Sequence, residues 1–481
     1  MLNLCDAAIA TAKRRGARYA DARIIESRDQ RLLVRNHAIA TAEDAESLGC
    51  GVRALVDGCW GFAATPDVTP QGVQKAAAEA VEVARASRRL KAGSVELAPV
   101  PPVTDRWHTP CLVDPFTIPL QEKLDLLYRL NDVLKQGPKI AAAEATMGFW
   151  RERKWLATTD GARIDQTLLT SGAGFQATAV GEGESQTRSY PMSFGGQYAG
   201  LGYELIPALD LPAHAEQTRE EAISLLTAAP CPDAEMDLVI DGTQLALQIH
   251  ESVGHPTELD RVLGTEESYA GRSFATVEKK GRFRYASPHV TLVADGTIPT
   301  GLATYGYDDD GVRAQRWLMV DRGRLAAYST NREFSHQAGE PPRGTCRAES
   351  WARFPLIRIP NLSLMPGDTT LARLIAETKD GLFLTTNRCW SIDQMRLNFE
   401  FGCEIGWRIR NGKLAEMVKS PSYRGITPRF WNSCDGVADE SHWNLWGVVN
   451  CGKGQPGQRA QMSHGAAPAR FRNVKVFPGR A

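Results

Sequence analysis

Two short turn sequences lie between strand-like runs and restrict those parts of the chain to antiparallel sheet. One is Asp57-Gly58 and the other is Asn411-Gly412. Both sequences are favoured where the two central residues of a turn adopt positive φ, as a tight β-hairpin requires. The sequence therefore predicts one hairpin near each end of the chain, formed by the runs 51–56 with 60–64 and 405–409 with 414–418.

Helical and strand-like patterns alternate over the first 230 residues. We expect a helix near 4–15 and a second helix that Thr69 caps, that Pro70 begins and that ends near Arg88. Leucines at helical spacing over 120–134 predict a third helix, and a fourth is expected over 214–227. Strand-like runs fall at 19–25, 31–34, 141–149, 154–158 and 163–169, and the proline-bearing stretch 99–110 is typical of a linker.

From residue 290 onward, strand-like runs predominate, at 290–293, 316–320, 325–328, 356–359, 382–385 and 397–401 as well as in the second hairpin. We therefore predict an α+β fold. An N-terminal α/β domain spans 1–230, with a sub-boundary near 97–110. A largely antiparallel, sheet-like or barrel-like C-terminal domain spans 231–481 and carries a distorted metal-binding helix.

The C-terminal domain contains the segment His250-Glu251-Ser252-Val253-Gly254-His255. Imidazole is a common metal ligand, and hydrolysis needs a carboxylate beside a metal-activated water. Two ordinary polar residues at a helix end would give the same pattern, so the motif alone is a hypothesis.

The five-residue spacing of the histidines requires a distorted helix. In an α-helix each residue advances about 100°, so positions i and i+5 point about 140° apart. A π-helical turn would return both rings to one face. Gly254 gives the backbone freedom, and Pro256 ends the helix. We predict a short strand over 237–240 and a helix over 243–254 that carries this distortion.

Two histidines do not complete a catalytic zinc site, which usually has three protein ligands and one open position. Spacing does not choose the third ligand among the downstream candidates, which are the cysteines and Glu258, Asp260, Glu266, His289, His336, His442 and His464.

Charge and hydropathy limit the partners. The formal net charge of +0 argues against nucleic acid or an anionic membrane as partner. No apolar stretch approaches the roughly 20 residues that span a bilayer. The N-terminus has no basic region followed by an apolar run, so we expect a cytoplasmic protein whose 10 cysteines are mostly reduced.

Four ordered segments carry a family likeness. They are 250–260, which continues the histidine motif as Pro-Thr-Glu-Leu-Asp, then 305–311, 347–350 and 450–455. Together they resemble the TldD/PmbA metallopeptidases. The likeness runs through most of the chain and is weakest over the first 230 residues. A departure is the Ser252-Val253-Gly254 context, which differs from the best-known members and leaves substrate preference open.

The resemblance implies the ligand set and the partners. Cys451 would join His250 and His255 in holding one Zn²⁺ per catalytic chain, although sequence does not distinguish zinc from another divalent metal. Peptides or unfolded polypeptides would be the substrates. The family's paired form implies a homodimer or a heterodimer with a paralogue that lacks the motif. This chain has the motif, so it resembles the catalytic kind.

The remaining roles are hypotheses. Glu251 would act as general base, and Glu258 or Asp260 would orient a ligand histidine. The candidates for an oxyanion or substrate contact are Tyr307, His289 and His336. Two alternatives stay open: a noncatalytic peptide-binding partner or carrier with a structural metal, which four protein ligands would favour, and a zinc amidase for small amides, which a narrow pocket would favour.

Overall fold

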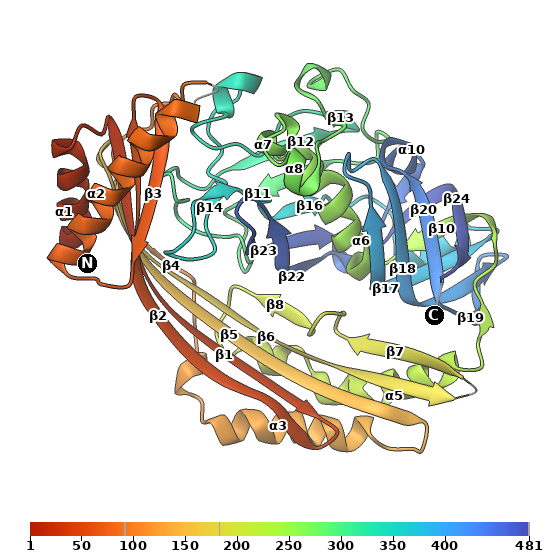
Figure 1. The fold of residues 1–481 in the computed structure, drawn as a ribbon. Helices are drawn as coiled ribbons and strands as arrows, with labels where there is room; N and C mark the ends of the chain where they lie inside the picture. The colour runs from red at the N-terminus through yellow and green to blue at the C-terminus, as the bar shows by residue number, and fades with distance from the viewer. Residues whose placement is uncertain (91–92, 182, 480–481) are drawn as a thin grey trace.

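A long, curved sheet forms one side of the molecule (Figure 1). The computed structural model describes residues 1–90, 93–181 and 183–479. The strands of this sheet are β1 (Tyr19–Arg35), β2 (Ala38–Val56), β3 (Cys59–Thr65), β4 (Thr104–His108), β5 (Ile140–Thr158), β6 (Arg163–Gly181), β7 (Glu184–Tyr190) and β8 (Gln197–Ala199). Their order is β3-β2-β1-β5-β6-β4, and β7 and β8 also pair with β6. Among these pairings only that of β4 with β6 is parallel.

The first predicted hairpin is confirmed. β2 and β3 pair with Val56 opposite Cys59, and the turn residues Asp57 and Gly58 have φ values of 51° and 75°. Both residues therefore adopt the left-handed conformation that the Asp-Gly sequence favours.

Helices cover this sheet. They are α1 (Leu2–Arg14), α2 (Pro70–Ser87), α3 (Leu120–Leu134), α4 (Leu205–Ala208) and α5 (Leu211–Leu225). The predicted cap of α2 is confirmed, because the Thr69 hydroxyl accepts a hydrogen bond from the Gly72 N–H at 3.1 Å. In Figure 1, α1 and α2 pack at one end of the sheet, whereas α3 and α5 lie beneath its other end.

Three predictions for this region need correction. The runs 141–149 and 154–158 are parts of the single strand β5, which pairs with β1 and β6 along this length. The runs 19–25 and 31–34 are parts of the single strand β1, because β2 and β5 bond to it along both edges even where its side chains are polar. Residues 99–110 are not only a linker, because they contain β4. The prolines of this stretch lie before and after β4, so none removes a donor from the strand itself.

The second half of the chain contains a closed barrel. Its strands are β10 (Ala234–Ile240), β17 (Asp380–Ile392), β18 (Asn398–Arg410), β20 (Pro421–Ile426) and β24 (Ala469–Pro478). β17 pairs with both β10 and β18, so the path β17-β10-β24-β20-β18 returns to its start. The strands β9 (Ala229–Pro230), β19 (Lys413–Lys419) and β21 (Cys434–Val437) extend it. The hairpin of β18 and β19 around Asn411-Gly412 is confirmed.

Smaller elements surround the barrel. A four-stranded sheet contains β11 (Leu292–Asp295), β12 (Arg316–Asp321), β13 (Arg324–Leu325) and β16 (Leu362–Leu364), and two-stranded pairs are formed by β14 (Cys346–Arg347) with β15 (Leu356–Ile357) and by β22 (Asn444–Lys453) with β23 (Gln458–Ala466). The helices here are α6 (Gly242–Ile249), α7 (Leu259–Val262), α8 (Glu267–Ala270), α9 (Leu371–Ala376) and α10 (Thr427–Asn432). The expected α+β class with mostly antiparallel sheets is confirmed.

A buried ionic cluster joins the two halves. Asp309 accepts hydrogen bonds from Arg23 of β1 at 2.9 Å and from Lys154 of β5 at 2.6 Å, and all three side chains are buried. Arg53 of β2 binds the neighbouring Asp310 at 2.7 Å. The long sheet is therefore tied to the C-terminal half by buried charged groups.

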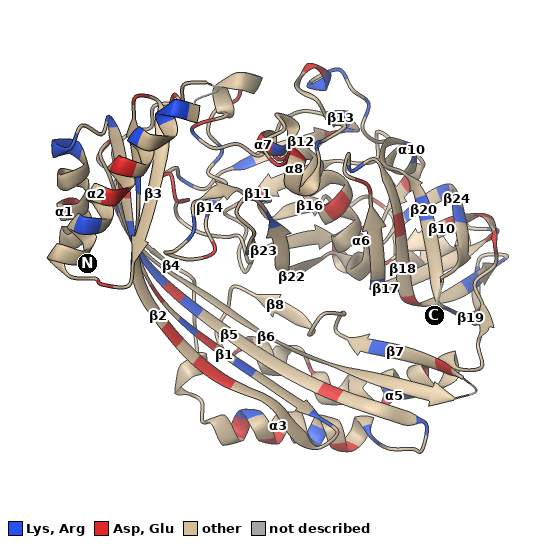
Figure 2. Cartoon of the chain, in the orientation of Figure 1, with Lys and Arg blue, Asp and Glu red and all other residues tan. Residues whose placement is uncertain are grey.

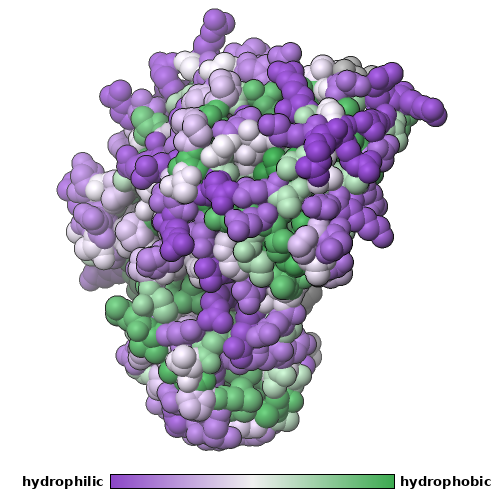
Figure 3. All heavy atoms as spheres, turned by 90° about the vertical axis from the view of Figure 1, so that its left-hand side faces the viewer, coloured by the Kyte–Doolittle hydropathy of each residue, from purple (hydrophilic) through white to green (hydrophobic). Residues whose placement is uncertain are grey.

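Residues of both charge signs are spread along the chain. Figure 2 shows Lys and Arg interspersed with Asp and Glu along the helices and the long strands, in keeping with the formal net charge of +0. The face seen in Figure 3 is mostly hydrophilic, with hydrophobic residues between. Within the three described ranges, no helix combines the length and the apolar character needed to cross a bilayer.

Candidate metal centre

The helix that follows β10 is interrupted at the histidine motif, as predicted. α6 begins after Asp241, whose carboxylate caps it by accepting from the Thr243 N–H. At His250 the helix changes to a π-helical turn that ends at Gly254, and a short 3₁₀ turn carries His255 onward. Gly254 packs closely on Ile359, since an added Cβ would approach its Cδ1 to 2.8 Å. The π-turn brings the two imidazoles together, with ring centroids 4.9 Å apart.

A thiol from a distant strand meets the two imidazoles. Cys451 lies on β22 next to an irregularity in its pairing with β23. Its Sγ is 3.6 Å from Nε2 of His255, and one donor atom from each of His250, His255 and Cys451 lies within 4.8 Å of the others. All three side chains are buried. Two imidazoles and one thiolate are a donor set that suits Zn²⁺ and leaves a fourth position open.

The hydrogen bonds of His255 assign its tautomer. Nδ1 lies 2.8 Å from Oε2 of Glu258. A carboxylate accepts, so Nδ1 carries the proton, and Nε2 is left with its lone pair toward the thiol. Burial lowers the pKa of His255 well below its usual range, which favours this neutral form. Glu258, one of the two carboxylates expected to orient a ligand histidine, therefore contacts a candidate ligand.

His464 assigns the tautomer of His250 in the same way. Nδ1 of His464 lies 2.9 Å from the carbonyl oxygen of Leu362. A carbonyl oxygen can only accept a hydrogen bond, so Nδ1 of His464 carries the proton. Nε2 of His464 therefore accepts from Nδ1 of His250, at 2.8 Å. Burial lowers the pKa of both rings, that of His464 well below its usual range. Nε2 of His250 is thereby left with a free lone pair. His464, a candidate ligand from sequence, lies behind His250 instead.

A buried cation stabilises the acidic groups beside His255. Lys453 donates to Asp260 at 2.7 Å and lies 3.2 Å from Glu258 and 3.4 Å from Glu266. Burial raises the pKa of Asp260 to about 6, because desolvation outweighs the nearby ammonium. Asp260 binds Lys453 and, among the described residues, no ligand histidine. Asp260 reaches the candidate ligand His255 only indirectly, through Lys453 and Glu258.

A guanidinium lies beside the thiol. Arg358 donates from Nη2 to the carbonyl oxygen of Cys451 at 2.5 Å and approaches its Sγ to 3.3 Å. Burial by itself raises the pKa of the Cys451 thiol, whereas a protonated His255 and the permanently charged Arg358 lower it. With His255 neutral, the guanidinium of Arg358 is the neighbouring cation that stabilises the thiolate. The surroundings of this cysteine favour the thiolate, the form that binds metals.

A pocket of about 270 Å³ opens directly over these groups. His250, Glu251, His255 and Cys451 all line it. The carboxylate of Glu251 accepts from Arg396 at 2.6 Å. At the rim, Phe194 and Trp390 meet edge to face with centroids 5.5 Å apart, and the two side chains are 44% and 40% exposed. Water and an acyl group can therefore reach the candidate base and the three donor atoms from one side.

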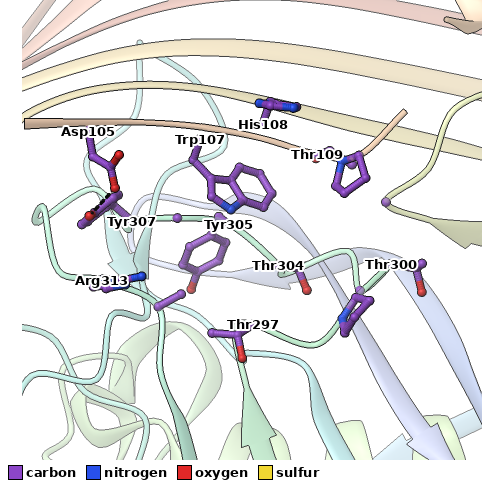
Figure 4. A pocket seen from close by; sticks show the side chains of 16 residues that line it. Asp105, Trp107, His108, Thr109, Thr297, Thr300, Thr304, Tyr305, Tyr307 and Arg313 are labelled. Carbon is purple, nitrogen blue, oxygen red and sulfur yellow. Dashed lines mark hydrogen bonds between the residues drawn. The ribbon is translucent and has the colours of Figure 1, made fainter. Parts of the chain in front are cut away.

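Three other sequence candidates lie outside the residues that line this pocket. Tyr307 donates its hydroxyl to Asp105 at 2.7 Å and lines a second cavity of about 350 Å³ between β4 and the loop before β12 (Figure 4). His289 and His336 are exposed, in a turn and in a short 3₁₀ helix. The structure brings none of the three to His250. Arg396, Arg358 and Lys453, which sequence reasoning did not name, contact the site instead.

Comparison with known proteins accounts for nearly the whole chain. A model of the PmbA/TldA metallopeptidase C-terminal domain matches residues 233–477, and models of domain 1 and of the central domain match 20–84 and 113–226. The chain belongs to the PmbA/TldD metallopeptidase family. The resemblance read from the four segments is thus confirmed, and so is the prediction of a metallopeptidase.

Individual family members align over most of their length. A metalloprotease of Methanothermobacter thermautotrophicus is 27% identical over 458 residues, which are 95% of this chain and 95% of that protein. A zinc metalloprotease TldD homolog of Saccharolobus solfataricus is 24% identical over 276 residues, 57% of this chain and 59% of the relative. The crystal structure of TldE from Thermococcus kodakarensis superposes with a TM-score of 0.72 at 14% identity, covering 98% of this chain and 100% of that one. That last similarity establishes a shared fold.

Proposed function

We propose that this chain is a zinc-dependent peptidase that hydrolyses peptides or unfolded polypeptides. In this proposal His250, His255 and Cys451 hold the metal, and Glu251 is the general base. The observation that carries it is the convergence of three buried donor atoms, within 4.8 Å of one another, beside a carboxylate on the floor of an open pocket.

The hydrogen bonds around the donors support a metal rather than a protonated cluster. In both imidazoles Nδ1 donates to a fixed acceptor, so that Nε2 keeps its lone pair for a metal. Metal-binding histidines usually have this arrangement. When bound, a divalent metal supplies a Lewis acid that activates water and polarises a carbonyl group. The name of the Saccharolobus relative supports zinc as that metal.

Glu251 is the group placed to move protons. It would accept a proton from the attacking water while the water oxygen bonds to the carbonyl carbon. As the C–N bond breaks, the same carboxyl group would pass the proton to the leaving nitrogen, and the products are a carboxylic acid and an amine. Arg396 occupies Oε2 of this carboxylate, and no described residue bonds to Oε1.

The family and the exposed apolar rim of the pocket support peptides as the substrate class. The rim residues Phe194 and Trp390 offer exposed apolar surface to side chains of an extended peptide. The family resemblance supports an assembly of two chains, either two identical chains or this chain with a motif-less paralogue. Mass measurement of the purified protein under native conditions, alone and with such a paralogue, distinguishes the two.

Metal content and turnover test the proposal together. We expect one zinc per chain and chelator-sensitive cleavage of an unstructured peptide. Glu251→Gln should keep the zinc and abolish cleavage, whereas Cys451→Ala should lose zinc. Cys111→Ala removes an exposed cysteine and is the matched control for the second variant. The wild-type protein could instead bind zinc without cleaving peptide, and X-ray absorption could show a fourth protein ligand. That result would establish a noncatalytic protein with a structural metal.

A further inference from the structure

Among the described residues that line the pocket over Glu251, Arg396 supplies the one guanidinium. It comes from the turn between β17 and β18, a part of the chain about 145 residues from the histidine motif. Its Nη1 donates to Oε2 of Glu251 at 2.6 Å, and the two side chains are only 15% and 7% exposed. A charge-assisted bond of this length in a buried site fixes both groups.

The other donors of this guanidinium are unused. Nε is buried and, within the described residues, has no hydrogen-bond partner. Nη2 donates to no described residue either, and unlike Nε it is not enclosed. Because the side chain lines the pocket, this N–H group is available to an oxygen atom of a bound molecule.

The backbone of Arg396 adopts a conformation that arginine disfavours. Its φ is 60°, in the left-handed region that residues other than glycine seldom adopt. The turn is fixed on both sides, because Asp393 accepts from the N–H of Leu397, and Thr427 donates its hydroxyl to the carbonyl oxygen of Arg396. Strained conformations that the surroundings enforce gather at functional sites.

We propose that Arg396 is a catalytic residue that donates a hydrogen bond from Nη2 to the substrate carbonyl oxygen as negative charge develops on it. This inference rests on the proposed function, and it supplies the oxyanion donor that Tyr307, His289 and His336 do not provide. One planar guanidinium would then hold the base through Nη1 and the oxyanion through Nη2. The spacing between base and acyl group is thereby set by a rigid group, in a site where preorganised donors act most strongly.

The first experiment measures turnover. Arg396→Gly relieves the backbone strain and deletes the donor, and Arg396→Lys keeps the charge but not the planar fork. With a quenched-fluorescent unstructured peptide, we expect kcat to fall about 100- to 1000-fold for the glycine variant, with KM and zinc content nearly unchanged. Arg322→Gly is the matched control, because Arg322 also has positive φ, 41°, in an exposed turn between β12 and β13.

Chemical rescue separates a missing guanidinium from a damaged turn. Added guanidinium ion, at millimolar concentration, should restore part of the kcat of Arg396→Gly and leave Arg322→Gly unchanged. The proposal would be overturned if Arg396→Gly lost activity only on peptides with a free terminal carboxylate and cleaved amidated peptides normally. Arg396 would then anchor the substrate carboxylate instead.

The second experiment asks whether Arg396 touches the oxyanion or acts only by holding Glu251. A phosphinic pseudopeptide mimics the charged tetrahedral carbon, and its binding to the zinc-loaded protein needs no turnover. In a Glu251→Gln background, Arg396→Gly should weaken its binding about 10- to 100-fold, as expected for a lost hydrogen bond to a charged group. Unchanged binding in that background would reduce Arg396 to a positioning residue and contradict the proposal. If the wild-type protein binds the phosphinate but cleaves no peptide, the proposed function is refuted. The binding comparison between the variants with and without Arg396 still decides the role of Arg396.

Discussion

Lys453 and Glu258 form a fully buried ion pair, 3.2 Å apart, directly behind His255. The same ammonium group contacts Asp260 and Glu266, so one cation faces three carboxylates. Lys453 lies only two residues after Cys451 on β22. The strand that supplies the candidate thiolate therefore also supplies the ammonium group that faces the Glu258 carboxylate behind His255.

Replacing Lys453 should damage both the fold and the metal site. Lys453→Met leaves buried carboxylates without their cation, and breaking a buried pair in this way costs about 3–5 kcal/mol. Urea unfolding of the metal-free protein measures this loss, and a zinc titration should show weaker binding because Glu258 no longer holds His255 firmly. Lys413→Met, on the exposed part of β19, is the control. Equal unfolding free energies for the two variants would contradict the expectation.

His464 should contribute to metal affinity without being a ligand. His464→Leu removes the acceptor for Nδ1–H of His250 and frees that ring to turn or to change tautomer. Loss of such a partner typically weakens metal binding about 10- to 100-fold. Competition with a chromophoric chelator gives the zinc Kd. His289→Leu, at an exposed histidine, should leave that Kd unchanged, and the same Kd in both variants would argue against the role of His464.

Local signals predicted the fold and the histidine pair well. The Asp57-Gly58 and Asn411-Gly412 turns and the cap at Thr69 depend on neighbouring residues alone, so the sequence contains all the information they need. The π-turn follows in the same way from the spacing of His250 and His255 and from Pro256, which cannot continue the helix.

Contacts between distant segments could not be read from the sequence. Arg396 reaches the site from the β17–β18 turn, Arg358 from the end of β15 and Lys453 from β22. A charged residue on a strand or turn carries no local sign of which carboxylate it will meet. Cys451 was named through the family resemblance and not through spacing. The oxyanion candidates Tyr307, His289 and His336 were chosen by residue type, and type does not specify position.

The buried ionic cluster around Asp309 should contribute strongly to the stability of the contact between the long sheet and the C-terminal half. Burial would raise the pKa of Asp309, but Lys154 and Arg23 lower it to about 2, below the ordinary 3.8. Its folded pKa is depressed, so its stabilising contribution is fully present above about pH 4 and is lost as pH falls toward 2. Asp309→Asn leaves two buried cations underpaired, at a cost of about 3–5 kcal/mol at about pH 7.

Urea unfolding at neutral pH checks the Asp309 variant, with Asp321→Asn, at a partly exposed position, as control. The expected loss is large for the first and within about 0.5 kcal/mol of zero for the second, as is usual at surface positions. An Asp309 variant as stable as the control would show that Asp310 and its partner Arg53 hold the halves together without it.

Glu333 should give the protein a stability that declines between mildly acidic and neutral pH. Its carboxyl group accepts from Nε1 of Trp60 at 3.0 Å, and burial raises its pKa from 4.5 to about 7 although that bond lowers it. Between these two values the folded state binds more protons than the unfolded state, so stability falls as pH rises. At higher pH the ionised, half-buried group costs up to about 3 kcal/mol, since a tenfold change in proton affinity corresponds to about 1.4 kcal/mol.

Glu333→Gln removes the titration and keeps an acceptor for Trp60. The variant should be about as stable as the wild type at about pH 4.5 and more stable by about 2–3 kcal/mol at about pH 8, where the wild-type carboxylate is charged. Urea unfolding of metal-free protein at the two pH values measures the difference, and Glu349→Gln, at a partly exposed carboxylate bound to Arg459, corrects for general effects of removing a charge. If the variant gains no stability over this pH range relative to the Glu349 control, the carboxyl group of Glu333 stays hydrated despite its contact with Trp60.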